Sequence, residues 1–102
     1  MRLVALSGPL SGSTFALEGE PMTVGRDRSN GLHLRDLAVS RHHCTIEPAG
    51  AGWRLRDLES LHGTFVNGVP VRARDLQPGD RITVGGTLLL LQDNDEEPEP
   101  AA

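Results

Sequence analysis

Short apolar runs alternate with turn-forming residues along the whole chain, and this pattern predicts an all-β domain. The breaks fall roughly every eight to twelve residues, a spacing typical of a β-sandwich or a β-barrel. Residues 53–57 alternate apolar and charged positions, as a strand with one buried face should. Ten strands are expected from the pattern, at residues 2–6, 14–18, 22–24, 32–34, 44–47, 53–57, 64–66, 69–71, 81–84 and 87–91.

Two glycine-containing turns predict β-hairpins, and no helix is expected. Asn67-Gly68 separates two of the predicted strands, and Gly85-Gly86 separates two others. No segment keeps an apolar period of 3.6 residues for three turns. The best helical candidate, residues 36–43, contains β-branched Val39 and has no apolar stripe. These turns support the all-β assignment.

The negative charge of the chain is concentrated at its C-terminal end. The 102 residues carry a formal charge of -4, but residues 93–102 hold five acidic residues and no basic one. Residues 1–92 therefore hold nine acidic and ten basic residues, all ten of them arginine. We expect one domain at 1–92 and a disordered acidic tail or linker at 93–102. A near-neutral body with three aromatic residues does not predict nucleic-acid binding.

Composition also bears on compartment and chemistry. The longest run of large apolar residues, 88–91, is far shorter than a membrane span requires, and the N-terminal run is too short for a signal peptide. Cys44 is the single cysteine, so no internal disulfide is expected. We expect a cytoplasmic protein without a membrane partner, a metal or a cofactor.

Polar residues gather in three segments between predicted strands. Residues 25–30, 40–43 and 60–64 are rich in arginine, serine, histidine and glycine. Loops of a β-sandwich cluster at its two ends. If these segments share one end, they bring guanidinium, hydroxyl and imidazole donors to one surface. Such a surface suits a phosphate group, which arginine can bind with two parallel hydrogen bonds.

Five motifs, in order and covering about residues 3–92, carry a family resemblance. They are Gly25-Arg26, Val39-Ser40-Arg41-His42-His43, Trp53-Arg54-Leu55-Arg56-Asp57, Ser60-X-X-Gly63-Thr64-Phe65-Val66-Asn67-Gly68 and Leu76-X-X-Gly79-Asp80-X-Ile82-X-Val84-Gly85. With them the chain resembles forkhead-associated (FHA) domains, which bind phosphothreonine peptides. The resemblance implies an eleven-stranded β-sandwich whose ligand-binding loops lie at one end.

The resemblance also implies a role for individual residues. The phosphate would be bound by Arg26, Ser40 and Arg41. The peptide around it would contact Leu61, His62 and Asn67, with Asn67-Gly68 also turning a hairpin. The loops themselves would be structured by Gly25, His43, Gly63 and Thr64.

Two of these positions depart from the usual family pattern. The family commonly has Ser-X-Asn-Gly-Thr, whose asparagine binds the main chain of the ligand, where this chain has Ser60-Leu61-His62-Gly63-Thr64. His62 lacks the adjacent donor and acceptor of an amide. Leu61 replaces a residue that is often polar and often contacts phosphate. We expect weaker binding or a changed peptide preference.

The leading hypothesis is a non-catalytic module that binds a phosphothreonine-containing protein in trans, either a kinase substrate or an autophosphorylated Ser/Thr kinase. The first alternative keeps the fold but binds partners independently of phosphorylation, with a site eroded at Leu61 and His62. The second is a hydrolase that uses Ser40, His43 and Asp36. Zinc binding by the histidines and Cys44 is disfavoured, because adjacent His42 and His43 would face opposite sides of an extended strand. The tail can also link the domain to further domains.

Overall fold

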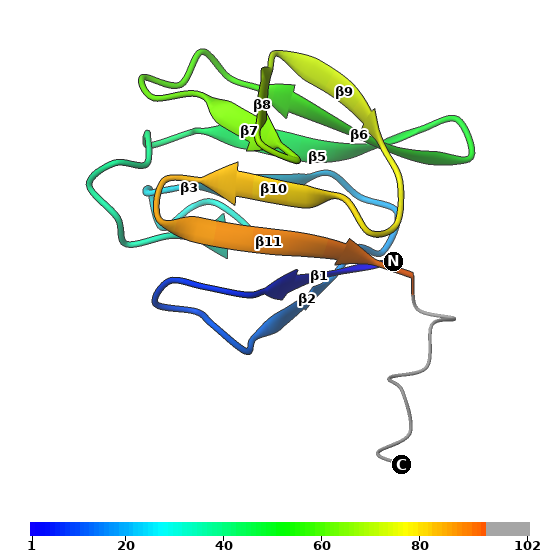
Figure 1. Cartoon of the computed structure of the whole chain (residues 1–102), viewed down its shortest axis with the longest axis horizontal. Helices are drawn as coiled ribbons and strands as arrows, with labels where there is room; N and C mark the ends of the chain where they lie inside the picture. Colours follow the sequence, from blue (N-terminus) through cyan, green and yellow to red (C-terminus); the bar gives the residue numbers. More distant parts are fainter. Residues whose placement is uncertain (94–102) are drawn as a thin grey trace.

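The computed structural model describes residues 1–93, which form eleven strands and no helix (Figure 1). The all-β prediction is therefore confirmed. The strands are β1 (Arg2–Ala5), β2 (Thr14–Ala16), β3 (Met22–Gly25), β4 (Leu32–His33), β5 (Cys44–Ala49), β6 (Gly52–Asp57), β7 (Thr64–Val66), β8 (Val69–Val71), β9 (Ala73–Leu76), β10 (Arg81–Val84) and β11 (Thr87–Gln92). Residues 1–93 contain no helix that could cross a membrane.

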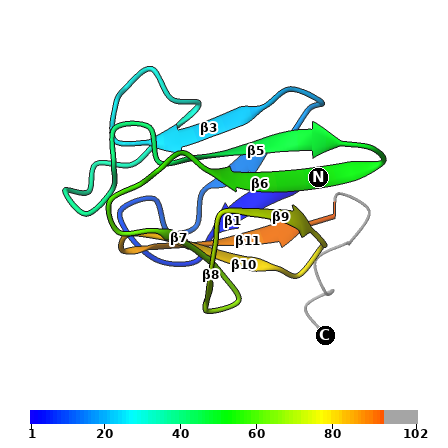
Figure 2. The ribbon, with the colours of Figure 1, turned by 90° about the horizontal axis from the view of Figure 1, so that it is seen from above.

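The strands form two sheets that face each other (Figure 2). The six-stranded sheet has the order β2-β1-β11-β10-β7-β8, and the five-stranded sheet has the order β4-β3-β5-β6-β9. Pairing is antiparallel except between β3 and β4. Both predicted hairpins are confirmed, because β7 pairs with β8 across Asn67-Gly68 and β10 pairs with β11 across Gly85-Gly86.

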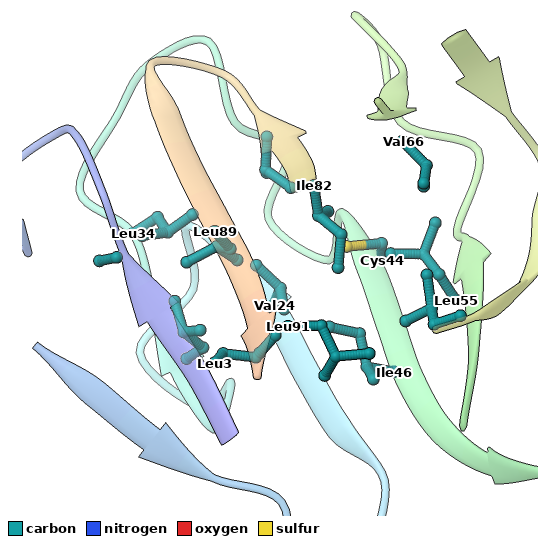
Figure 3. Packing of buried hydrophobic residues seen from close by; sticks show 14 of the residues in the cluster. Leu3, Val24, Leu34, Cys44, Ile46, Leu55, Val66, Ile82, Leu89 and Leu91 are labelled. Atoms are coloured by element: carbon teal, nitrogen blue, oxygen red, sulfur yellow. The ribbon is translucent and has the colours of Figure 1, made fainter. Parts of the chain in front are cut away.

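The core lies between the two sheets and follows from the alternation of the strands. Thr87, Leu89 and Leu91 of β11 are buried, whereas the residues between them are partly exposed. Figure 3 shows Leu89 and Leu91 on the side of β11 that faces Val24 and Ile46 of the other sheet. Burial of such side chains stabilises the sandwich by about 1.5–3 kcal/mol each. The sandwich thus provides a rigid base for its loops.

The pattern missed one strand and ended another too early. β9 (Ala73–Leu76) was not predicted, because its first three residues are exposed on an edge strand and only Leu76 is buried. β5 was expected to end before Pro48 but continues to Ala49. β3 pairs with β5 only as far as Ile46, so at Pro48 one side of the strand has no neighbour. A proline without an N–H group is tolerated at such a position.

Residues 36–43 form an irregular connection, which agrees with the absence of a predicted helix. Asp36 organises it by accepting hydrogen bonds from the Ala38 N–H (2.9 Å) and from the Gly86 N–H (2.8 Å). These bonds lower the pKa of Asp36 below its usual value. The long β4–β5 loop is thereby attached to the β10–β11 turn. The predicted tail lies outside the described residues except for Asp93, so its disorder and the boundary at residue 92 stay predictions.

Candidate functional site

The three polar segments meet at one end of the sandwich (left in Figures 1 and 2). Backbone hydrogen bonds join the β3–β4 loop to the β4–β5 loop, from Arg26 N–H to the Ser40 carbonyl (3.0 Å) and from Asp27 N–H to the Arg41 carbonyl (3.1 Å). The β6–β7 loop joins them through the Leu61 N–H, which donates to Ser40 Oγ at 3.0 Å. The three segments are therefore neighbours, with Arg26, Ser40 and Leu61 at their junction.

Arg26 is held in one orientation at the end of β3. Its Nε donates a hydrogen bond to the carbonyl of buried Val39 at 3.0 Å. Within residues 1–93 its two terminal amino groups have no hydrogen-bond or ion-pair partner. A guanidinium fixed through Nε presents these two groups as a fork. Such a fork matches two oxygens of a phosphate.

Ser40 is fixed by both of the neighbouring loops. Its N–H donates to His43 Nδ1 at 3.1 Å, and its Oγ accepts the Leu61 N–H. Because the hydroxyl group acts there as an acceptor, its hydrogen remains available as a donor. Among the described residues it has no acceptor. Ser40 can therefore donate to an anion that Arg26 binds.

His43 connects the β4–β5 loop to the β6–β7 loop from inside the protein. The side chain is fully buried, and its Nε2 donates to the Gly63 carbonyl at 2.8 Å. Since Nδ1 accepts from Ser40 and Nε2 donates to Gly63, the bonds require the neutral imidazole with its hydrogen on Nε2. His43 therefore fixes the spacing of the two loops without reaching the surface.

Close packing at the end of β3 depends on Gly25 and on Asn30. A Cβ atom at Gly25 would overlap the carbonyl oxygen of Arg41 and lie 2.7 Å from Asn30 Nδ2. The buried Asn30 amide donates to the carbonyls of Asp27 and Arg41, both at 2.7 Å. Sequence reasoning missed Asn30, because an asparagine in a polar loop gives no signal that it is buried. Its side chain, together with the Asp27 N–H, joins the β3–β4 loop to the Arg41 carbonyl.

Asp57, the last residue of β6, stabilises the β6–β7 loop. Its Oδ1 accepts hydrogen bonds from Ser60 Oγ (2.6 Å) and Thr64 Oγ1 (2.7 Å), and its Oδ2 accepts the Ser60 N–H (3.1 Å). Ser60 Oγ in turn accepts the Gly63 N–H at 3.0 Å. Burial alone would raise the pKa of Asp57, but the hydrogen bonds from Ser60 and Thr64 outweigh it and lower the pKa. Asp57 lies in the motif at residues 53–57, from which the sequence predicted no role for it in the loops.

The model of the FHA domain family matches residues 22–85, which include all three loops. The chain belongs to the FHA domain family. It is 35% identical over 95 residues to the oxoglutarate dehydrogenase inhibitor of Corynebacterium jeikeium, covering 93% of this chain and 66% of that protein. A third of that relative therefore has no counterpart here.

Solved FHA domains have the same sandwich. One, from a structural and functional analysis of phosphothreonine-dependent FHA domain interactions, has a TM-score of 0.83 and 32% identity, covering 93% of this chain and 97% of the other. A second is the FhaA FHA domain complexed with the intracellular domain of Rv3910. Its TM-score is 0.79 with 34% identity, covering 87% of this chain and 96% of the other. The FHA-type sandwich is thus confirmed.

Three of the predicted contact residues, Arg41, Leu61 and His62, are exposed on the two loops that carry Ser40 and Leu61. Arg41 and His62 are exposed, and 82% of the Leu61 surface is accessible. Leu61 is therefore placed next to Ser40 by its backbone while its side chain extends into solvent. An apolar side chain so exposed contributes little to the folded domain, and it is available to a partner.

Asn67 is not brought to these loops. It follows β7 at the end away from Thr64, where its side chain donates to Asp80 Oδ1 and accepts the Arg81 N–H, both at 3.0 Å. The predicted peptide contact of Asn67 has no basis in this position, because the length of β7 separates the residue from Ser40. Its amide instead joins two turns at the opposite end of the FHA domain.

The side chains proposed for a hydrolase do not form a Ser-His-Asp chain. Ser40 contacts His43 through its backbone N–H and not through Oγ, and Asp36 bonds to Ala38 and Gly86 instead of an imidazole. His43 is also not free to bind zinc, since both of its ring nitrogens are engaged in hydrogen bonds. Cys44 is buried, which raises the pKa of its thiol to about 12. The His43 imidazole and the Cys44 thiol therefore lack the arrangement that catalysis or metal binding requires.

Proposed function

We propose that this FHA domain is a non-catalytic module that binds phosphothreonine-containing segments of other proteins. The proposal rests on two sets of available donors, those of Arg26 and Ser40, on loops that are bonded to each other. The terminal amino groups of Arg26 and the hydroxyl hydrogen of Ser40 have no acceptor within residues 1–93, and hydrogen bonds with Val39, Leu61 and His43 fix the two residues. Donors fixed before the ligand arrives bind it at a smaller entropic cost.

Phosphorylation acts as an electrostatic switch on this surface. A phosphate group adds about -1.5 to -2 charges and three strong acceptor oxygens to a threonine. Arg26 and Arg41 supply positive charge, and Ser40 supplies a hydroxyl donor. An unmodified threonine offers these groups one neutral hydroxyl. We therefore expect binding only after phosphorylation, with a dissociation constant in the micromolar range, about -8 kcal/mol.

The proposed partner is a phosphorylated protein bound in trans, either a kinase substrate or an autophosphorylated Ser/Thr kinase in the cytoplasm. The solved FhaA FHA domain complexed with an intracellular domain supports a partner of this kind. None of the six threonines of this chain lies in the tail, and Thr64 and Thr87 are fully buried within strands. Binding of its own phosphorylated tail is therefore not proposed.

A second candidate, binding independent of phosphorylation, is favoured by Leu61 and His62. An exposed leucine beside Ser40 replaces a polar side chain with an apolar contact, and His62 replaces an amide. A partner could then bind through apolar contact alone. The two candidates differ in how binding responds to the phosphate and to Arg26.

The test uses an oriented peptide library with a fixed central residue, synthesised with threonine, phosphoserine or phosphothreonine. Binding to the wild type, to Arg26→Ala and to Arg81→Ala is measured by fluorescence anisotropy. Arg81 is the matched control, because it is an exposed arginine at the end of β10 away from Val84, which pairs with Thr64. We expect binding of the phosphothreonine library alone, lost in Arg26→Ala and retained in Arg81→Ala. Equal binding of threonine and phosphothreonine libraries contradicts the proposal and supports the second candidate.

A further inference from the structure

A groove with a volume of about 770 Å³ borders the β6–β7 loop. One wall is the end of β6 with the loop itself and the start of β7, and the other is β8 with Arg72 and the first residue of β9. Its lining includes Arg56, Asp57, Ser60, Thr64, Val71 and Arg72. The groove is open to solvent along its length, and none of the residues assigned to phosphate binding lies in it. It is large enough for several residues of an extended peptide.

The groove and the proposed phosphate site share the β6–β7 loop as a common wall. Leu61 donates from this loop to Ser40, and the Gly63 carbonyl accepts from His43. Ser60 and Gly63 of the same loop line the groove. A peptide whose phosphate lies at Arg26 and Ser40 therefore reaches the groove by crossing a single loop.

The charges available in the groove are mainly positive. The guanidinium of Arg72 is exposed and has no hydrogen-bond or ion-pair partner within residues 1–93. Arg56 is also exposed, and its interaction with Glu47 is long, at 3.4 Å. The Asp57 carboxylate is engaged by three hydrogen bonds from Ser60 and Thr64.

One further carboxylate, that of exposed Glu59, lies at the groove. The groove therefore holds two arginines, Arg56 and Arg72, and one carboxylate, Glu59, that makes no hydrogen bond within residues 1–93. An incoming carboxylate would meet guanidinium groups that can bind it with two parallel hydrogen bonds. Pro70, Val71 and Ala73 add apolar surface against which an extended backbone can lie.

We propose that this groove binds the residues next to the phosphothreonine and selects carboxylate side chains there. The preferred partner is thus an acidic segment that contains phosphothreonine. This inference rests on the proposed phosphothreonine binding, which supplies the anchor. The acidic C-terminal residues of the same chain are a less suitable occupant, because β11 ends at the opposite end of the sandwich from the β6–β7 loop (Figure 1).

Four phosphothreonine peptides test the groove, with glutamate or glutamine at the flanking positions on the N-terminal or on the C-terminal side. Their affinities are measured by fluorescence anisotropy for the wild type, Arg72→Gln and the double variant Arg56→Gln/Arg72→Gln. Arg81→Gln is the control, since Arg81 is an exposed arginine that does not line the groove. We expect glutamate on one side to tighten wild-type binding about five- to tenfold, as two partly exposed charge pairs would. The double variant should lose this advantage, and Arg81→Gln should keep it.

Equal binding of glutamate and glutamine peptides to the wild type, or an advantage that survives in the double variant, overturns the inference. A glutamate advantage seen only in a variant that ends at Gln92 also overturns it, because the tail would then occupy the groove. Threonine versions of the peptides separate this failure from that of the proposed function. If they bind like the phosphothreonine peptides, phosphate recognition itself fails and the inference fails with it.

Discussion

Substitution of His43 by alanine tests whether a buried side chain maintains the proposed binding loops. The imidazole is fully buried and supplies an acceptor to the Ser40 N–H and a donor to the Gly63 carbonyl. Each lost hydrogen bond costs about 1 kcal/mol, and a buried group left without a partner costs about 1–3 kcal/mol. Because the deletion also leaves a cavity, we expect the free energy of unfolding to fall by about 3–4 kcal/mol.

Urea denaturation at constant temperature measures this loss, with an unchanged m-value as evidence that the unfolded state is the same. A loss of 3 kcal/mol corresponds to a fall in Tm of roughly 12 °C or more for a domain of this size. His43→Gln should lose less, because an amide carries both a donor and an acceptor. His62→Ala is the control and should change stability by less than about 0.5 kcal/mol, since His62 is exposed.

The prediction for His43 also covers phosphopeptide binding. Without the imidazole, the Ser40 backbone N–H loses its acceptor and only the Arg26 N–H still holds this backbone through the Ser40 carbonyl, so the folded fraction of His43→Ala should bind a phosphothreonine peptide less tightly than the wild type. A cost in stability below about 1 kcal/mol, equal to that of His62→Ala, would refute the reasoning. It would mean that the two loops keep their spacing without this bridge.

Three further outcomes follow from the same contacts. Gly25→Ala should destabilise the domain by about 2 kcal/mol or more in urea, because a Cβ there would overlap the Arg41 carbonyl, whereas Gly52→Ala, with no atom nearer than 4.0 Å, should be almost neutral. The lowered pKa of Asp57 means that its hydrogen bonds stabilise the fold above the unfolded-state pKa of about 3.9 and that this stability is lost as the pH falls through the folded-state pKa. Asp57→Asn should therefore reduce stability at neutral pH and make stability fall less steeply in acid. The free energy of unfolding of the two proteins is measured against pH, and identical slopes would contradict the prediction. Cys44 should not react with a thiol reagent in the folded protein, because burial raises its pKa to about 12, and rapid labelling without urea would contradict this.

Residue types and their order were enough to predict the class of fold and the three polar loops that meet at one end of it. Alternation in residues 53–57 and the turns at Asn67-Gly68 and Gly85-Gly86 predicted strands and hairpins, because these depend on local geometry. Arg26 and Ser40 were recognised from local motifs and from the order of those motifs along the chain. β9 was missed, because an exposed edge strand has no apolar alternation.

The tertiary structure decided what each side chain can do. Asn30 and Asp57 are ordinary polar residues in the sequence, yet folding surrounds them with the hydrogen-bond partners that hold two of the loops. Asn67 was assigned to the peptide by its place in a motif, and the direction of β7 takes it to the other end of the domain. The sequence alone determined which chemical groups are present and which short motifs they form, because both are properties of single residues and their immediate neighbours in the chain. Which of those groups face one another depends on contacts between residues far apart in the chain, and only the packing of the two sheets fixes those contacts.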